Sequence, residues 1–130
     1  MWKIALALFL VFHGLIHLGY FAPAPADPKY PFTLRNSWLA SAAGLDVSAT
    51  HTIGIVLGIA AVCGFVLTGL ASVGLVIPQS WWPPLMVIAS GASLLMLVIF
   101  WNSILILGIV IDVVLLVSVL GLGWQPLTIR

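Results

Sequence analysis

Three long stretches of this chain carry almost no charge. No charged residue occurs in residues 4–26 or in residues 52–77, and residues 81–124 contain one, Asp112. A helix of about 20 apolar residues is long enough to cross the hydrocarbon core of a bilayer. Each stretch therefore predicts at least one transmembrane helix.

The composition excludes an ordinary soluble domain. Hydrophobic residues make up 63% of the 130-residue chain and charged residues only 5%, whereas soluble domains carry about 25% charged residues. So few charges cannot cover a water-facing surface, and we expect the lipid bilayer to surround the fold. The formal net charge of +1 provides no basic surface for nucleic acid, so we expect no nucleic-acid partner.

The stretch 81–124 is too long for a single crossing. Its roughly 44 residues would extend about 66 Å as a helix, and the hydrocarbon core is only about 30 Å thick. The one plausible corner is Asn102, in FWNSI. We therefore predict a single domain over residues 1–130, an all-α integral membrane bundle of four helices with spans near residues 2–22, 51–74, 82–100 and 104–122.

Aromatic residues support this division independently. Tryptophan is enriched where a membrane helix reaches the headgroups, and five tryptophans fall at the predicted helix ends: Trp2, Trp81, Trp82, Trp101 and Trp124.

Residues 23–50 form the one sizeable polar loop. The segment PAPADPKYP should be extended, because proline fixes φ and removes backbone donors. The segment NSWLASAAGLD could form a short interfacial helix, capped by Asn36 or Ser37 and anchored by Trp38; the alternative is an irregular loop.

The N-terminal segment could be mistaken for a signal peptide, because Ala24-Pro25-Ala26 resembles a cleavage site. The apolar run continues to about Ala22, beyond the roughly 7–15 residues of a signal core, so we expect an uncleaved first helix. Lys and Arg are balanced between the two sides of the membrane, and the length of the first loop favours termini inside. We expect the cytoplasmic membrane of a bacterium or an archaeon.

Small residues indicate where helices could approach closely. Gly54 and Gly58 form a small-xxx-small pair in the second span, and Ala89 and Ser93 form another in the third. Cys63 is the one cysteine and lies in the apolar segment AVCGFV, so we expect a buried, inert thiol.

Titratable residues within membrane spans are rare and usually face the bundle interior. His13 and Asp112 each lie about 12 Å from the same end of their helices, counted at 1.5 Å per residue. We therefore predict a hydrogen bond or ion pair between them. His17, one turn after His13 on the same face, and His51 lie nearer that end and could share a shallower layer.

The role of this polar cluster is open from the sequence. The leading interpretation is structural: the contact fixes how the helices pack. His13, His17 and Asp112 could instead bind a metal, as two histidines and a carboxylate do in iron enzymes. A haem held by His17 and His51 is another alternative. A quinone headgroup site or a proton relay would use the titration of histidine near neutral pH.

The segment FHGLIHLGYF resembles the first-helix signature of DoxX-like membrane proteins, in which HG is followed by a polar residue and an aromatic turn. The glycine-rich second span ending in GLVIP and the two helices after it are similar to the four-helix plan of that family. His17 stands where many relatives have lysine. The resemblance implies a small bundle, in some members a subunit of quinone-linked oxidoreductases.

Three functions follow as hypotheses. The first is a non-enzymatic accessory or scaffold subunit, with other membrane subunits or further copies of itself as partners, because the chain has almost no soluble part to hold substrate chemistry. The second is a redox accessory subunit that binds a quinone, a metal or a haem through His13, His17 and Asp112. The third is a small transporter or proton-relay protein. No nucleotide-binding or nucleophile motif is present, so we assign no catalytic residue. We expect no cofactor, with a quinone, a metal or a haem as the alternatives.

Overall fold

The computed structural model describes residues 1–126 except 28 and 36, and this part of the chain contains helices and no strand. Four helical segments are long and apolar enough to cross a membrane. The predicted all-α architecture with four spans is therefore confirmed. The elements in chain order are α1 (Trp2–Ile16), η1 (His17–Phe21), α2 (Trp38–Ala42), α3 (Val47–Val73), η2 (Gln79–Trp81), α4 (Trp82–Ile99), η3 (Ser103–Leu105), α5 (Ile106–Leu116) and η4 (Val117–Gly121).

The second span begins earlier than predicted. Its helix α3 starts at Val47 rather than near residue 51, because the Asp46 side chain accepts a hydrogen bond from the Ala49 backbone N–H at 2.7 Å. An aspartate in this position satisfies a free donor of the first helical turn. The helix ends at Gly74, whose φ of +69° is the left-handed conformation typical of a glycine helix stop.

The corner between the third and fourth spans lies at Asn102, as predicted. Helix α4 ends at Ile99 and η3 begins at Ser103. The Asn102 side chain accepts a hydrogen bond from the Ile104 backbone N–H at 3.0 Å, so it caps the first turn of the last span. The result is a hairpin in which α5 packs against α4.

The polar loop contains the expected short helix, α2. Ser37 is its N-cap and accepts from the Ala40 N–H; Asn36, the other predicted cap, lies outside the described residues. The loop is also tied to the end of α4, because Ser37 Oγ donates to the Ile99 carbonyl and Trp38 Nε1 donates to the Val98 carbonyl, each at 2.7 Å. These bonds satisfy backbone acceptors that a helix end leaves free.

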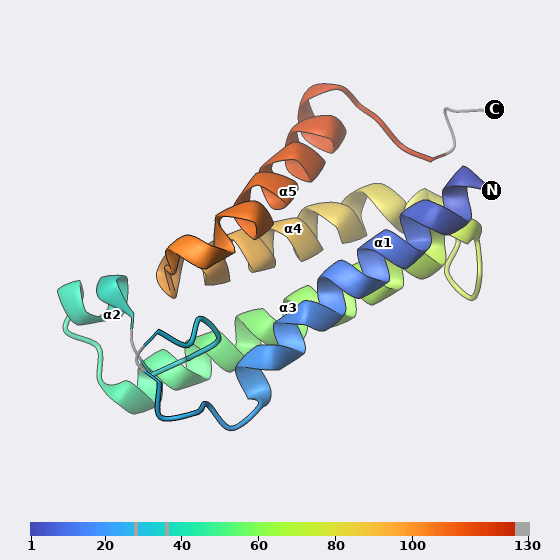
Figure 1. Ribbon diagram of the computed structural model, residues 1–130. Coiled ribbons are helices and arrows are strands. Elements are labelled where there is room, and N and C mark those ends of the chain that lie inside the picture. The colour runs from blue at the N-terminus through green and yellow to red at the C-terminus, as the bar shows by residue number, and fades with distance from the viewer. Residues whose placement is uncertain (28, 36, 127–130) are drawn as a thin grey trace.

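The four spans are arranged as an open arc. Helix α3 packs against α1 on one side and α4 on the other, and α5 packs against α4 (Figure 1). Helices α1 and α5, at the two ends of the arc, make hardly any backbone contact with each other in the described chain. One side of the bundle is therefore open between them.

The close helix contacts use partly different small residues from those predicted. A Cβ added at Gly64 would lie 2.8 Å from the Ala89 Cβ, so Ala89 does mark the close approach of α3 and α4. Gly54 and Gly58 instead make room for side chains, those of Leu34 and Phe21 respectively.

The contact between α1 and α3 depends on Gly14 and Gly69, which the sequence did not single out. A Cβ at Gly14 would lie 2.7 Å from the Phe65 Cβ, and one at Gly69 would lie 2.9 Å from the Ala7 carbonyl oxygen.

The prediction for Cys63 is wrong in one respect. The thiol is exposed on the outer side of α3 rather than packed inside the bundle. Because Cys63 lies within a candidate membrane span, we expect lipid around it.

Candidate functional site

Four polar side chains meet inside the bundle. His13 and His17 come from the end of the first span, Ser93 from α4 and Asp112 from α5. His13 is 6% exposed, His17 is 3% exposed, and Ser93 and Asp112 are fully buried. We call these four residues the polar network. Groups buried to this degree need hydrogen-bond partners to offset their lost hydration, and here they provide them for one another.

The contact predicted from helix depth is present. His13 Nε2 lies 3.0 Å from Asp112 Oδ1. Asp112 is also the one buried residue of α5, a helix that the structure describes in full. The bond therefore bridges the two helices at the open side of the arc, where backbone packing is slight.

Ser93 links the carboxylate to the second histidine. Its hydroxyl oxygen lies 2.5 Å from Asp112 Oδ2 and 2.8 Å from His17 Nε2. The small-xxx-small pattern of Ala89 and Ser93 indicates only a packing role for Ser93 and does not reveal this link. A signal was available, because Ser93 precedes the end of α4 by about 9 Å of helix, close to the depth assigned to His13 and Asp112.

His17 is held from both sides of its ring. Its Nδ1 lies 3.2 Å from the backbone carbonyl oxygen of His13, one turn earlier, while Nε2 contacts Ser93. The aromatic ring of Phe65 on α3 covers both imidazoles: its centroid lies 4.7 Å from that of His13, edge-on, and 6.3 Å from that of His17, stacked. The two rings are therefore fixed in orientation.

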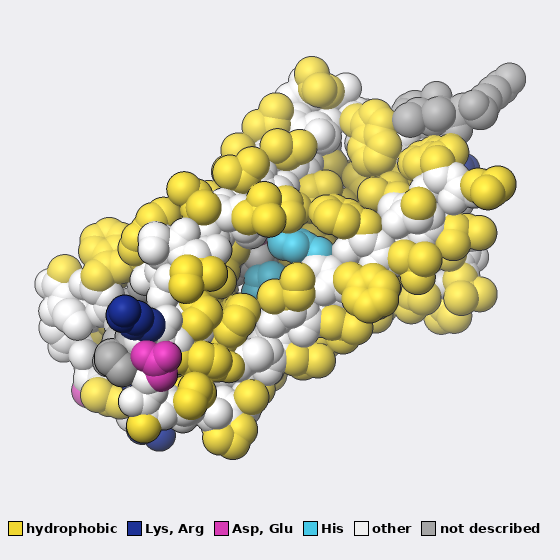
Figure 2. All heavy atoms as spheres, viewed as in Figure 1, with side chains coloured by type: hydrophobic (Ala, Val, Ile, Leu, Met, Phe, Trp, Pro, Cys, Tyr) yellow, Lys and Arg dark blue, Asp and Glu magenta, His cyan; other side chains and the backbone are white. Residues whose placement is uncertain are grey.

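A pocket of about 220 Å³ lies beside the network, between the end of the first span and the start of the last. His13 and His17 line it together with apolar side chains. Figure 2 shows histidine atoms at the bottom of a hollow among hydrophobic atoms on this face. The lining residues are His13, Ile16, His17, Tyr20, Phe32, Leu97, Ile104, Leu105, Leu107, Gly108 and Ile111. We call this pocket the α1/α5 groove.

Tyr20 has the one unsatisfied buried polar side-chain atom in the described part of the chain. The side chain is 5% exposed and its hydroxyl has no hydrogen-bond partner. The ring packs edge-on against Phe32, with centroids 5.3 Å apart, and stacks beside His17 at 6.5 Å. A buried hydroxyl without a partner costs about 1–3 kcal/mol, so this atom requires an explanation.

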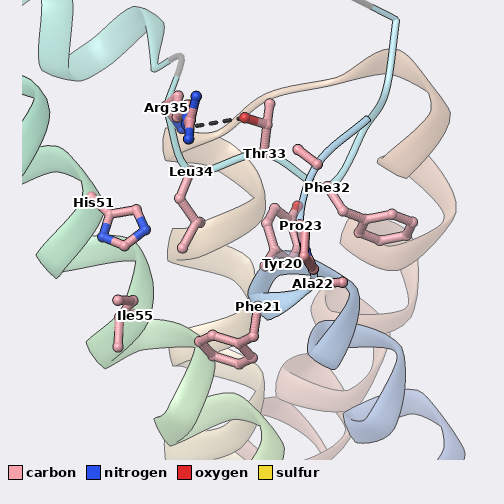
Figure 3. Close-up of a pocket in the computed structure, with 11 residues that line it drawn as sticks. Tyr20, Phe21, Ala22, Pro23, Phe32, Thr33, Leu34, Arg35, His51 and Ile55 are labelled. Atoms are coloured by element: carbon pink, nitrogen blue, oxygen red, sulfur yellow. Dashed lines mark hydrogen bonds between the residues drawn. The ribbon is translucent and has the colours of Figure 1, made fainter. Parts of the chain in front are cut away.

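His51 does not belong to the polar network. It is exposed and lines a second pocket of about 280 Å³, together with Arg35 and Thr33 of the polar loop (Figure 3). Tyr20 lies in the wall of both pockets. The prediction that His51 belongs to the polar cluster is therefore wrong, because His51 and His17 line different pockets.

The metal and haem alternatives find little support in this geometry. Within the described residues, no three histidine, cysteine, aspartate or glutamate side chains are grouped so that they could hold a metal ion. Both ring nitrogens of His17 are occupied by contacts with protein atoms, so pairing it with His51 across a haem would break the network.

Comparison of the chain with protein-family models, with curated proteins and with solved structures found no match, so the resemblance to DoxX-like proteins stays a prediction.

Proposed function

We propose that this membrane protein binds the headgroup of a lipophilic molecule of the quinone class in the α1/α5 groove. The observation that carries the proposal is the buried Tyr20 hydroxyl, which has no protein partner and belongs to a residue that lines this groove. A phenolic O–H can donate to a carbonyl oxygen, and a quinone ring carries carbonyl oxygens on an otherwise flat, apolar frame.

The shape and position of the groove support a ligand from the membrane. At about 220 Å³ it is smaller than the roughly 300–1,000 Å³ of pockets for drug-sized molecules, which suits one ring with its tail left in lipid. Its rim consists of exposed apolar side chains, including Ile16, Ile104 and Leu107 at 57%, 67% and 67% exposure. Such a rim favours entry from the hydrocarbon rather than from water.

The test is binding of a short-tailed benzoquinone to the purified protein, followed by the rise in thermal unfolding temperature with ligand concentration. Tyr20→Phe removes the hydroxyl and keeps the ring, and we expect it to weaken binding roughly 2- to 10-fold, the value of one neutral hydrogen bond. Tyr30→Phe is the matched control, because this half-buried tyrosine lies outside the lining of the groove. The same tail on a benzene ring without carbonyls should bind less well than the quinone.

A second pair of variants tests the location. Gly108 lines the groove, and a Cβ there would already lie 2.9 Å from the end of the Leu97 side chain. Gly108→Leu should therefore fill the groove and abolish binding, while Gly91→Leu, where a Cβ would meet open space, should leave binding unchanged. Quinone binding that survives Gly108→Leu and does not depend on the Tyr20 hydroxyl would refute the proposal.

A role as an accessory subunit of a larger complex stays a prediction alongside this proposal. A subunit that supplies a headgroup site to a redox complex would combine the two, in keeping with the resemblance to DoxX-like proteins. The same resemblance leads us to propose the cytoplasmic membrane of a bacterium or an archaeon as the location of this protein.

A further inference from the structure

The position of one proton in the polar network follows from counting donors and acceptors. The backbone carbonyl of His13 can only accept, so the 3.2 Å contact with His17 Nδ1 requires a proton on Nδ1. His17 Nε2 is then bare if the ring is neutral and protonated if the ring is a cation. The state of His17 therefore depends on what Ser93 does at 2.8 Å from Nε2.

The Ser93 hydroxyl has a single proton for its two contacts. If it donates to Asp112 Oδ2, it must accept from a protonated His17 Nε2, and the network contains a carboxylate and an imidazolium. If it donates to a bare His17 Nε2, it must accept from a protonated Asp112 Oδ2, and both groups are neutral. In either case the two contacts, at 2.5 and 2.8 Å, are both hydrogen bonds only if one proton, in addition to that on His17 Nδ1, is held by Asp112 Oδ2 or by His17 Nε2.

We propose that Asp112 and His17 share this proton through Ser93. The proton on Asp112 Oδ2 moves to Ser93 Oγ while the hydroxyl proton of Ser93 moves to His17 Nε2, and the reverse step restores the neutral pair. The first transfer breaks the O–H bond of Asp112 and forms one on Ser93. The second breaks the original O–H bond of Ser93 and forms an N–H bond on His17. The net charge of the network does not change. We assign the side-chain proton of neutral His13 to Nε2, which lies 3.0 Å from Asp112 Oδ1. In this tautomer Nε2–H donates to Oδ1 in both forms, so His13 takes no part in the transfer.

Burial keeps the proton within the network. Loss of the proton would leave Ser93 able to satisfy either Oδ2 or Nε2 but not both, and neither Asp112 nor Ser93 is reached by solvent. The other titratable groups nearby are His13 and Tyr20 from the first span. Helix α4 has no titratable side chain, and on α3 His51 lines the second pocket while Cys63 is exposed on the outer side.

His17 connects the shared proton to the α1/α5 groove, which it lines. A headgroup bound there would lie beside the imidazole that shares the proton. This link to the groove rests on the proposed function, whereas the sharing itself does not.

The experiment is a pH titration of the protein without ligand, in detergent, with two probes. Infrared spectroscopy follows the carboxylic-acid C=O band of Asp112 and its loss in Asp112→Asn, and nitrogen NMR follows the His17 ring, assigned by replacing His13 and His51. As the pH rises and the network loses its proton, a shared proton predicts partial changes in both probes with one common midpoint, because coupled sites titrate as a pair. A change confined to one of the two groups would overturn the proposal.

Variants of Ser93 supply the second measurement. Ser93→Ala removes the link, and we expect the midpoints of Asp112 and His17 to separate by more than about 1 pH unit. Ser93→Thr keeps the hydroxyl and should keep the common midpoint. Ser90→Ala is the matched control, since Ser90 is also fully buried on α4 but donates to Met86 Sδ. A common midpoint that persists in Ser93→Ala would show that Ser93 does not transmit the proton.

The two proposals fail separately. A titration without added quinone does not depend on whether the groove binds one. If quinone binds but the two probes titrate apart, the proposed function stands without the relay. If the midpoints coincide and no quinone binds, the shared proton stands and the ligand class is wrong.

Discussion

At the scale of single residues, a carboxyl group inside a membrane is tolerable only when its neighbours satisfy it. Insertion of an aspartate at the centre of a membrane helix costs about 2.5–3.5 kcal/mol. Asp112 is fully buried, and its two oxygens are bonded to His13 and to Ser93. Side chains from two other helices, α1 and α4, therefore satisfy the two oxygens of this carboxyl group.

The His13–Asp112 bond predicts non-additive stability losses. His13→Ala alone leaves Asp112 Oδ1 buried without a partner, so it should destabilise the protein more than His13→Ala combined with Asp112→Asn, which removes the potential charge. We expect a coupling free energy of about 1 kcal/mol, within the range of interhelical hydrogen bonds in membranes. The measurement is a double-mutant cycle on unfolding in detergent.

The control cycle pairs Asp112→Asn with Ser72→Ala, whose hydroxyl accepts from Trp82 Nε1 and shares no partner with Asp112. Those two losses should add to within about 0.3–0.5 kcal/mol. Equally additive losses for His13 and Asp112 would show that their contact contributes no stability.

At the scale of the elements, the closest helix contacts depend on glycines, which have no side chain to keep the two backbones apart. Helix α1 approaches α3 so closely that a Cβ at Gly14 would lie 2.7 Å from the Phe65 Cβ. Close backbone approach of this kind is how membrane helices gain packing energy without a hydrophobic driving force between them. The same contact positions Phe65 against both imidazoles of the network.

Gly14→Ala should therefore separate α1 from α3. We expect a loss of about 1–3 kcal/mol in the free energy of unfolding, as for other overpacked sites. Gly91→Ala, where the added methyl meets open space, should be neutral or stabilising by up to about 1 kcal/mol, because alanine favours helix over glycine. Equal effects of the two substitutions on detergent unfolding would contradict the close approach.

At the scale of the whole molecule, the arc of helices gives the protein two different surfaces in the membrane. The outer sides of the spans are apolar, whereas the open side between α1 and α5 leads to the polar network. Cys63 lies on the outer side of α3, so its surroundings report whether this side of the bundle faces lipid or water.

A nitroxide attached to Cys63 in a reconstituted bilayer should be relaxed by molecular oxygen, which concentrates in hydrocarbon, and not by a water-soluble nickel chelate. The control is a nitroxide at Ala26→Cys in a Cys63→Ser background, because Ala26 is exposed in the polar loop and should respond to the chelate. Strong relaxation of the Cys63 label by the chelate would mean that α3 lines a water-filled path, and would favour the transporter hypothesis.

Properties that vary along a helix axis could be predicted from the sequence alone. Charge-free length predicted four spans, the excess length of residues 81–124 located the corner at Asn102, and the matching depth of His13 and Asp112 predicted their contact. Each of these depends on counting residues against the thickness of a bilayer, and such a count needs no knowledge of which way a side chain points.

The direction in which each side chain points around its helix axis became known from the packed bundle. The packing turned Ser93 into the network, Cys63 out of the bundle and His51 away from His17, and it left the groove between α1 and α5 open. In a soluble protein, the alternation of polar and apolar residues reveals the inward face of a helix. A membrane helix is apolar on its lipid face and on its packed face, so the sequence contains little signal for rotation, and only the contacts between helices determine it.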